Sequence, residues 1–153
     1  MTVKTKIISG NLLVLAGFVA DRVIKYLMIQ KFPDREFLLL GNWLKLKLAY
    51  NTGVAFGVPL NSYLILAAYL AILLAMVILI SICYRRRQLS SAIVFSFIFV
   101  GGFSNLIDRL KFGQVIDYFD LRYYSVFNLA DAMIVVGVLV VIALNWKKKK
   151  ELI

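Results

Sequence analysis

Histidine is absent from this chain, and cysteine occurs once, at Cys83. Without histidine the chain cannot build a Ser-His-Asp triad, a Cys-His pair, an HExxH zinc site or a histidine proton relay. A single cysteine cannot form an intramolecular disulfide. Acidic residues are also scarce, with eight among 153 residues. The few carboxylates are therefore the first place to look for chemistry.

The composition is typical of a membrane protein. Hydrophobic residues make up 62% of the chain, against roughly 45–50% in soluble domains, and the mean hydropathy is +0.86. The formal net charge of +10 would also suit a nucleic-acid-binding domain. However, the basic runs at 85–87 and 147–150 lie at the ends of apolar segments, where basic residues set membrane topology. We therefore expect one integral membrane domain, residues 1–153, with no nucleic-acid partner.

Four segments are apolar and long enough to cross a membrane, because a helical span needs about 20 such residues. They lie at about 7–29, 62–83, 91–107 and 129–146. Lys4 and Lys6 before the first segment would also suit a cleaved signal peptide. Residues 21–25 contain no small-residue cleavage site, and the apolar pattern resumes after them, so a span is the better interpretation.

An even number of spans places both termini on the same side of the membrane. The eighteen basic residues divide equally between the two sides, so a simple count does not give the orientation. Those on the side of the termini form short runs next to the span ends, where the positive-inside rule applies. We therefore expect both termini in the cytoplasm.

Two segments are expected on the outer side. In the first, at about 36–58, Leu44, Leu46 and Leu48 alternate with Lys45 and Lys47, as in a half-exposed strand. A turn at 51–53 and a returning strand at 54–58 would complete a small sheet on the membrane surface, although an ordinary hairpin explains the pattern as well. The second, at 108–127, is an aromatic loop typical of a membrane interface.

Half of the acidic residues lie between positions 108 and 131, flanked by apolar segments. They are Asp108, Asp117, Asp120 and Asp131. A carboxylate near hydrocarbon is costly and marks a candidate functional site. Two carboxylates brought together would share a proton, as in aspartic proteases. Spacing alone does not decide whether Asp117 or Asp120 would be the partner of Asp131.

Most of these charged residues also have a structural explanation. Asp21 and Lys25 are four apart on a predicted helix, where they would form an ion pair. Asn128 and Asp131 suit the N-cap and N3 positions of the last span.

Two further alternatives stay open. Arg109 would either hold a substrate carbonyl or headgroup, or form a salt bridge with Asp108. The other alternative to an aspartate pair is a Ser-Lys pair, formed by Ser104 or Ser125 with Lys25 or Lys111.

Five motifs, taken together and in this order, closely resemble those of the bacterial lipoprotein signal peptidases, also called signal peptidase II. They are Asp21-x-x-x-Lys25, Asn51-Thr52-Gly53-Val54-Ala55-Phe56-Gly57, Gly101-Gly102-x-x-Asn105-x-x-Asp108-Arg109, Val115-Ile116-Asp117-Tyr118 and Phe127-Asn128-x-Ala130-Asp131. The resemblance extends from the first span to the last. It implies an all-α membrane protein with four transmembrane helices and a small extracytoplasmic β-sheet, in the bacterial cytoplasmic (inner) membrane.

The resemblance also implies a role for each motif residue. Asp117 and Asp131, and not Asp120, would be the catalytic pair of an aspartic endopeptidase that needs no metal or other cofactor. The substrate-binding residues would be Asn51, Asn105, Arg109 and Asn128, and the supporting residues would be Asp21, Lys25, Asp108 and Ala130. The stretch between the two catalytic motifs is shorter than in many members.

The implied substrates are diacylglyceryl-modified prolipoproteins, cleaved just before the lipidated cysteine at the outer membrane face. We expect a monomer that contacts membrane lipid and is inhibited by globomycin-type cyclic peptides. Because a helix start favours negative charge at Asp131, Asp117 is the expected proton donor.

Two rival functions have different requirements. A small carboxylate-dependent transporter would need ionisable groups near the middle of its spans, and the centres of the predicted spans hold none. A non-enzymatic membrane adaptor would not need the aspartate pair at all.

Overall fold

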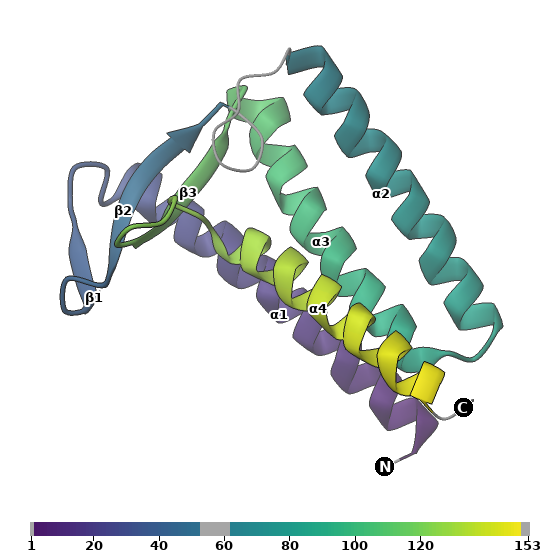
Figure 1. Ribbon diagram of the computed structural model, residues 1–153. Helices are drawn as coiled ribbons and strands as arrows, with labels where there is room; N and C mark the ends of the chain where they lie inside the picture. The colour runs from purple at the N-terminus through teal and green to yellow at the C-terminus, as the bar shows by residue number, and fades with distance from the viewer. Residues whose placement is uncertain (1, 53–61, 151–153) are drawn as a thin grey trace.

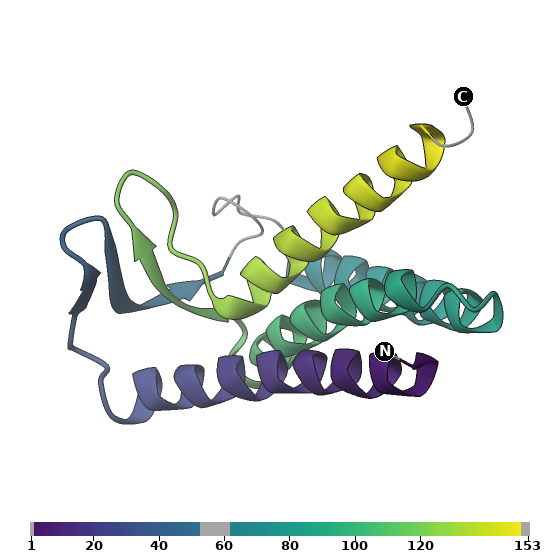
Figure 2. The same cartoon turned by 90° about the horizontal axis from the view of Figure 1, so that it is seen from below.

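The structure is a computed structural model that describes residues 2–52 and 62–150. Helix α3 (Leu89–Phe112) is central and packs against α1 (Val3–Gln30), α2 (Ser62–Arg85) and α4 (Leu129–Lys150). A three-stranded sheet lies at one end of the helices (Figure 1). The start of α1 and the end of α4 lie at the opposite end (Figure 2).

The helix boundaries follow from local sequence. The Thr2 hydroxyl caps α1 by accepting a hydrogen bond from the Thr5 backbone N–H at 3.2 Å. Gly113 ends α3 with a φ of 72°, a left-handed conformation that glycine adopts without strain. Each segment predicted to span the membrane lies within one helix. Helix α1 starts earlier than predicted, and α3 continues past 107 to Phe112.

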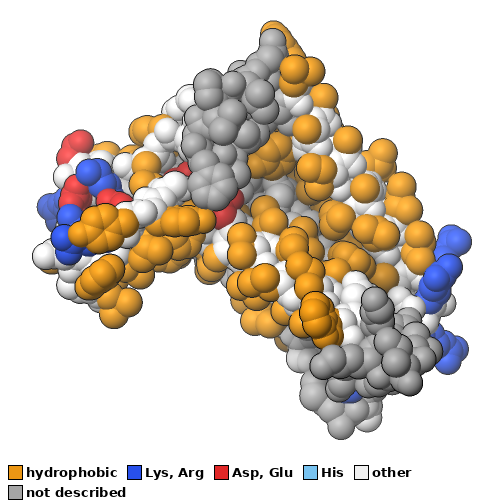
Figure 3. All heavy atoms as spheres, in the orientation of Figure 1, with side chains coloured by type: hydrophobic (Ala, Val, Ile, Leu, Met, Phe, Trp, Pro, Cys, Tyr) orange, Lys and Arg blue, Asp and Glu red, His pale blue; other side chains and the backbone are white. Residues whose placement is uncertain are grey.

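Within the described residues, three helical stretches are long and apolar enough to cross a membrane. They are Leu66–Arg85, Leu89–Phe112 and Leu129–Trp146. Helix α1 has 28 residues but carries five charged ones. Hydrophobic side chains cover the visible surfaces of α2 and α4, whereas the charged side chains gather toward the two ends of the molecule (Figure 3). Such a large exposed apolar surface on a helical protein is typical of a protein that contacts membrane lipid.

The sheet is antiparallel throughout, in the order β1 (Phe37–Leu40), β2 (Leu44–Asn51), β3 (Val115–Leu121). Lys45 pairs with Asp120 and Ala49 with Asp117, and the register shifts between these two pairs. Because the strand β3 leads directly from α3 and back toward α4, it holds Asp117 beside both helices.

One sequence-based expectation for the outer segments needs correction, and two extend beyond the described residues. The strand predicted at Leu44–Leu48 forms, but its described partners are β1 and β3, and the predicted returning strand at 54–58 lies outside the described residues. Asn51 is the last residue of β2, and the turn predicted at 51–53 continues outside the described residues. The segment 115–121, expected as part of a loop, is the strand β3. Residues 115–118 are all buried, so both faces of β3 are covered here and the polar–apolar alternation that marks a half-exposed strand is lost.

The first turn of α4 lies directly against α3 because Gly101 has no side chain. A Cβ atom at Gly101 would lie 2.6 Å from the backbone oxygen of Ala130. Ala130 itself is fully buried. This small-residue contact brings Asp131, at the start of α4, close to the polar face of α3.

Candidate active site

The predicted site residues converge where the sheet end of the helices meets strand β3. They come from α1, the end of β2, the last turns of α3, strand β3 and the start of α4. Apart from Ala130 they are polar or charged, and six of them are buried. The buried polar set is Asp21, Lys25, Asn105, Asp108, Asp117 and Asn128.

Asp117 is a buried carboxylate held by two amides. The side-chain amide of Asn128 donates to its Oδ1 at 2.6 Å, and that of Asn51 donates to its Oδ2 at 3.1 Å. Burial, and then the negative charge of Asp131, raises the pKa of Asp117 to about 6. The two amide hydrogen bonds and the Lys25 ammonium oppose this rise only in part. Asp117 is therefore a carboxyl group that can hold a proton near neutral pH.

Asp131 is half-buried and belongs to a reciprocal cap of helix α4. Its backbone N–H donates to Oδ1 of Asn128 at 2.8 Å, while its Oδ2 accepts from the Asn128 backbone N–H at 3.2 Å. This is a capping box, so the predicted capping role of Asn128 is confirmed. The second oxygen of Asp131, Oδ1, is left for other contacts and accepts from the Asn105 side-chain amide at 2.7 Å.

One residue, Asn128, contacts both aspartates. Its amide nitrogen donates to Asp117, and its oxygen accepts from the backbone of Asp131. Asp120 lies elsewhere, opposite Lys45 in the sheet, and lines a separate polar pocket with Asn42, Lys45 and Arg122. The structure thus places Asp117, and not Asp120, next to Asp131.

A charged cluster lies behind this pair. The Lys25 ammonium contacts Asp21 at 3.0 Å, Asp108 at 2.7 Å and the side-chain oxygen of Asn105 at 2.9 Å. Asp108 also pairs with Arg22, so two cations and two anions balance within the cluster. Burial of charge is tolerated when it is paired and hydrogen-bonded in this way. The predicted Asp21–Lys25 pair is confirmed, whereas Asp108 pairs with Lys25 and Arg22 and not with Arg109.

Asp21 reaches across from α1 to the start of α4. Its Oδ1 accepts from the Ala130 backbone N–H at 3.2 Å and from the Tyr118 hydroxyl at 2.9 Å. The Leu129 backbone N–H donates to the same hydroxyl at 3.0 Å. Together with Asn128, these groups satisfy the N–H groups that a helix start leaves open. Burial and the charge of Asp21 raise the pKa of Tyr118, so its hydroxyl stays a neutral donor.

The serine residues do not pair with lysine. The Ser104 hydroxyl donates to Asp21 at 2.6 Å, and the Ser125 hydroxyl contacts the backbone oxygen of Val126. Lys25 contacts Asp21, Asp108 and Asn105, and not Ser104. The predicted Ser104–Lys25 pair is therefore wrong.

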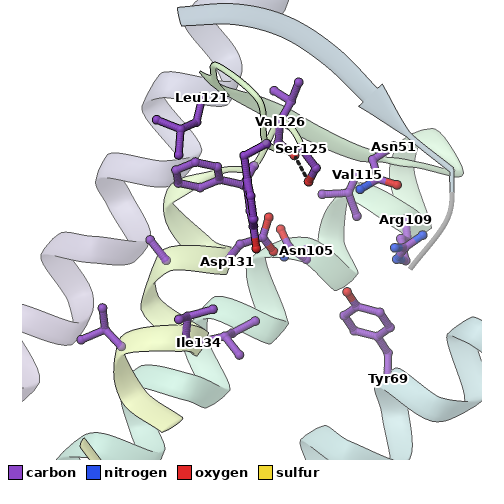
Figure 4. Close-up of a pocket in the computed structure, with 15 residues that line it drawn as sticks. Asn51, Tyr69, Asn105, Arg109, Val115, Leu121, Ser125, Val126, Asp131 and Ile134 are labelled. Atoms are coloured by element: carbon purple, nitrogen blue, oxygen red, sulfur yellow. Dashed lines mark hydrogen bonds between the residues drawn. The ribbon is translucent and has the colours of Figure 1, made fainter. Parts of the chain in front are cut away.

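A cavity of about 620 Å³ opens beside Asp131 (Figure 4). Asn105 and Asp131 lie together at one side of it, and Arg109 and Tyr69 lie at another. The Arg109 guanidinium is 5.0 Å from the centre of the Tyr69 ring. Most of the remaining wall is apolar and includes Leu121, Val126, Phe127, Ile134 and Val135. Within the described residues no group of three or more Cys, Asp and Glu side chains could hold a metal ion.

Comparison with known proteins gives the family. The sequence profile described as Signal peptidase (SPase) II matches residues 13–147. The chain belongs to the signal peptidase II family. The lipoprotein signal peptidase of Halothermothrix orenii is 32% identical over 143 residues, covering 91% of this chain and 96% of that protein. The lipoprotein signal peptidase of Moorella thermoacetica is 36% identical over 135 residues, covering 84% and 87%.

The fold agrees with the family assignment. A solved structure titled as a bacterial membrane enzyme, determined at 2.3 Å, matches with a TM-score of 0.81 over 94% of this chain and 90% of that chain. The sequence identity is 22%, so this likeness concerns the fold. The family assignment confirms the expectation of a protease that removes signal peptides from prolipoproteins, and it does not support the transporter.

Three residues of this candidate site were not among the predicted ones. Tyr118 looked like one more interfacial aromatic residue, although its place next to Asp117 in the family-like motif was a usable signal. Ser104 was considered only as part of a Ser-Lys pair, and Arg22 was not named as a site residue. Their contacts with Asp21 and Asp108 cross more than 80 residues of sequence, which helix spacing does not reveal.

Proposed function

We propose that Asp117 and Asp131 are the catalytic pair of an aspartic endopeptidase in the membrane. The enzyme removes the signal peptide of diacylglyceryl-modified prolipoproteins by cleaving just before the lipidated cysteine. The observation that carries this proposal is the shared contact with Asn128: its side-chain amide donates to the Asp117 carboxylate and its backbone N–H donates to the Asp131 carboxylate, which lines a largely apolar cavity. Neither a metal nor another cofactor takes part.

The two carboxylates have different roles in this mechanism. Asp117, with its pKa raised to about 6, carries the shared proton. Asp131 stands at the N-terminus of α4, where backbone N–H groups stabilise negative charge, and acts as the base. Such a pair titrates as a unit, so the roles describe the predominant arrangement.

The reaction conserves the proton of the pair. Asp131 takes a proton from a water molecule as the water oxygen bonds to the scissile carbonyl carbon. Protonated Asp117 polarises the carbonyl oxygen by a hydrogen bond. When the C–N bond breaks, Asp117 gives its proton to the leaving amine of the lipidated cysteine. One proton then remains on Asp131, and the two aspartates re-equilibrate for the next cycle.

The substrate approaches along the apolar part of the cavity. Tyr69 on α2 and Ile134 and Val135 on α4 face this space, and α2 and α4 both pack on α3. We propose that the signal-peptide helix and the acyl chains lie between α2 and α4. Asn51, Asn105, Asn128 and Arg109 then surround the scissile segment, with Arg109 orienting its carbonyl or headgroup.

The proposed topology has four spans, with both termini in the cytoplasm. Helix α1 is the additional span, and its charged residues near the sheet pair with one another or with α3. The protein lies as a single domain in the bacterial cytoplasmic (inner) membrane, with the sheet and aspartates at the extracytoplasmic face. It acts as a monomer and is inhibited by globomycin-type cyclic peptides.

A gel-shift cleavage assay tests this function. Purified protein in detergent receives a diacylglyceryl-modified prolipoprotein or the same substrate without lipid. We expect cleavage of the lipidated substrate only, and a loss of at least about 1,000-fold in Asp117→Asn and Asp131→Asn, as when other catalytic residues are removed. Substantial cleavage by folded Asp131→Asn would remove Asp131 from the mechanism. If folded wild-type protein cleaves neither substrate, the proposed activity is wrong.

A further inference from the structure

We propose that Lys25 is a positioning residue that fixes the orientation of the Asn105 side chain and, through it, the orientation of Asp131. This inference rests on the proposed function, because it assigns Lys25 a part in arranging the catalytic pair. Lys25 lies on α1 and is only 1% exposed. Within the described residues its ammonium contacts Asp21, Asp108 and Asn105, and it affects Asp117 only through its charge. An effect on the orientation of Asp131 must therefore pass through another group.

The three hydrogen-bond donors of the Lys25 ammonium match three acceptors. Two of these acceptors are the carboxylates of Asp21 and Asp108, and the third is Oδ1 of Asn105 at 2.9 Å. An ammonium group can only donate hydrogen bonds. It can therefore bind the oxygen of the Asn105 amide but not the nitrogen, which is also a donor.

The other end of the same amide faces Asp131. The Asn105 nitrogen donates to Oδ1 of Asp131 at 2.7 Å. With the oxygen held by Lys25, the nitrogen must point to the carboxylate. The Asn128 amide also donates to the Asn105 oxygen, at 3.1 Å, while the same amide contacts Asp117 and the Asp131 backbone. Of these two donors to the Asn105 oxygen, Lys25 is the shorter contact and carries the charge.

A flipped Asn105 would turn its oxygen toward the oxygen of Asp131. That arrangement removes a charge-assisted hydrogen bond and replaces it with repulsion between two acceptors. Asp131 would then leave the position in which it is shared between the Asn128 backbone and Asn105. The consequence is a less well-placed base, with little effect on the apolar walls that bind the substrate.

Arg22 provides a matched comparison within the same cluster. It is a cation on α1, it pairs with Asp108 as Lys25 does, and it contacts Ser104 in place of Asn105. Removing either cation leaves one unbalanced carboxylate. A second substitution, Asp108→Asn, restores charge balance in both cases. The double variants Lys25→Met/Asp108→Asn and Arg22→Met/Asp108→Asn therefore differ mainly in whether the contact with Asn105 survives.

The experiment compares kcat and KM of these two double variants on the lipidated prolipoprotein, after thermal unfolding has shown that both fold. We expect Lys25→Met/Asp108→Asn to have a kcat about ten- to a hundred-fold below that of Arg22→Met/Asp108→Asn, the range for a lost charge-assisted hydrogen bond. The KM values should differ much less than the kcat values, because the apolar walls that bind the substrate are unchanged. Equal kcat values in the two variants would overturn the proposal.

A second comparison tests whether Lys25 acts through Asn105. In an Asn105→Leu background there is no amide to orient, so adding Lys25→Met should lower kcat by less than about two-fold. A loss in this background as large as the loss in the wild-type background would assign Lys25 a separate, structural role. These outcomes differ from a failure of the proposed function, in which wild-type protein does not cleave the lipidated substrate.

Discussion

The environment of each carboxylate decides whether Asp117 or Asp131 holds a proton more readily. Asp117 is buried and accepts hydrogen bonds from two amide side chains, whereas Asp131 is half-buried at a helix start and accepts from a backbone N–H. Because these environments differ, one carboxylate keeps the shared proton more readily than the other. The asparagines serve both residues without adding charge, which leaves the proton free to move within the pair.

The raised pKa of Asp117 also makes stability depend on pH. Its pKa moves from the ordinary value of 3.8 to about 6 in the folded protein. Between these values the folded protein holds a proton that the unfolded chain has lost, so the contribution of Asp117 to stability is largest below about pH 4 and falls as the pH rises to about 6. The difference of about two pKa units corresponds to roughly 3 kcal/mol at pH 7.

Replacing Asp117 with asparagine should remove this pH dependence. We expect the stability of Asp117→Asn relative to wild type to improve by about 3 kcal/mol between pH 4 and pH 7. Unfolding in detergent at both pH values measures this, and the pH 4 value isolates the cost of the altered hydrogen bonds. The same difference at both pH values would mean that Asp117 is not protonated in the folded protein at intermediate pH.

Sequence spacing revealed only part of these residue contacts. The Asp21–Lys25 pair and the Asn128 cap lie within one helical turn, and both were predicted. The contact between Asp21 and Ala130 joins α1 to α4 across 109 positions, and no periodicity in either segment indicates it. The choice of Asp117 over Asp120 came from family resemblance, because both aspartates follow apolar residues at similar distances from Asp131.

At the scale of the elements, the helices were predictable because long apolar runs leave few alternatives in a membrane. The strand β3 was not, since its buried residues lack the alternation of a half-exposed strand. The strand is recognised only from its antiparallel pairing with β2 in the structure. The close contact of α3 with the start of α4 was also not predictable from the sequence. Gly101-Gly102 was part of a family-like motif, but the sequence did not show that Gly101 packs against Ala130.

The two neighbouring glycines allow a direct test of that contact. A methyl group at Gly101 would meet the rigid backbone oxygen of Ala130 at 2.6 Å, while one at Gly102 would meet the movable end of Leu73 at 3.2 Å. We expect Gly101→Ala to lose about 1–3 kcal/mol and to reduce turnover by shifting Asp131. Gly102→Ala should be neutral or gain up to about 1 kcal/mol from helix propensity. Thermal unfolding and the cleavage assay compare them, and equal losses would contradict the assigned contact.

At the scale of the whole molecule, charge and apolar surface divide the protein along the helices. Seven of the eight acidic residues lie in the half nearer the sheet, together with nine basic residues. Several of these cations are paired, as Lys25 and Arg22 are with Asp108, and as Lys45 and Lys47 are with Glu36. The other end carries unbroken basic runs, including the exposed residues 85–87. The two ends carry equal numbers of basic residues, but their net charges differ.

This asymmetry predicts the orientation, and the single cysteine makes the orientation measurable. Cys83 is buried near the end of α2, so Cys83→Ser gives a cysteine-free background. In this background a cysteine at Lys45, on the sheet, should react with a membrane-impermeant maleimide in intact cells or spheroplasts. A cysteine at Arg86, at the opposite end, should react only after the membrane is permeabilised. The reverse pattern would put the sheet and its aspartates in the cytoplasm, away from the face where exported prolipoproteins present their cleavage site, and the proposed topology would be wrong.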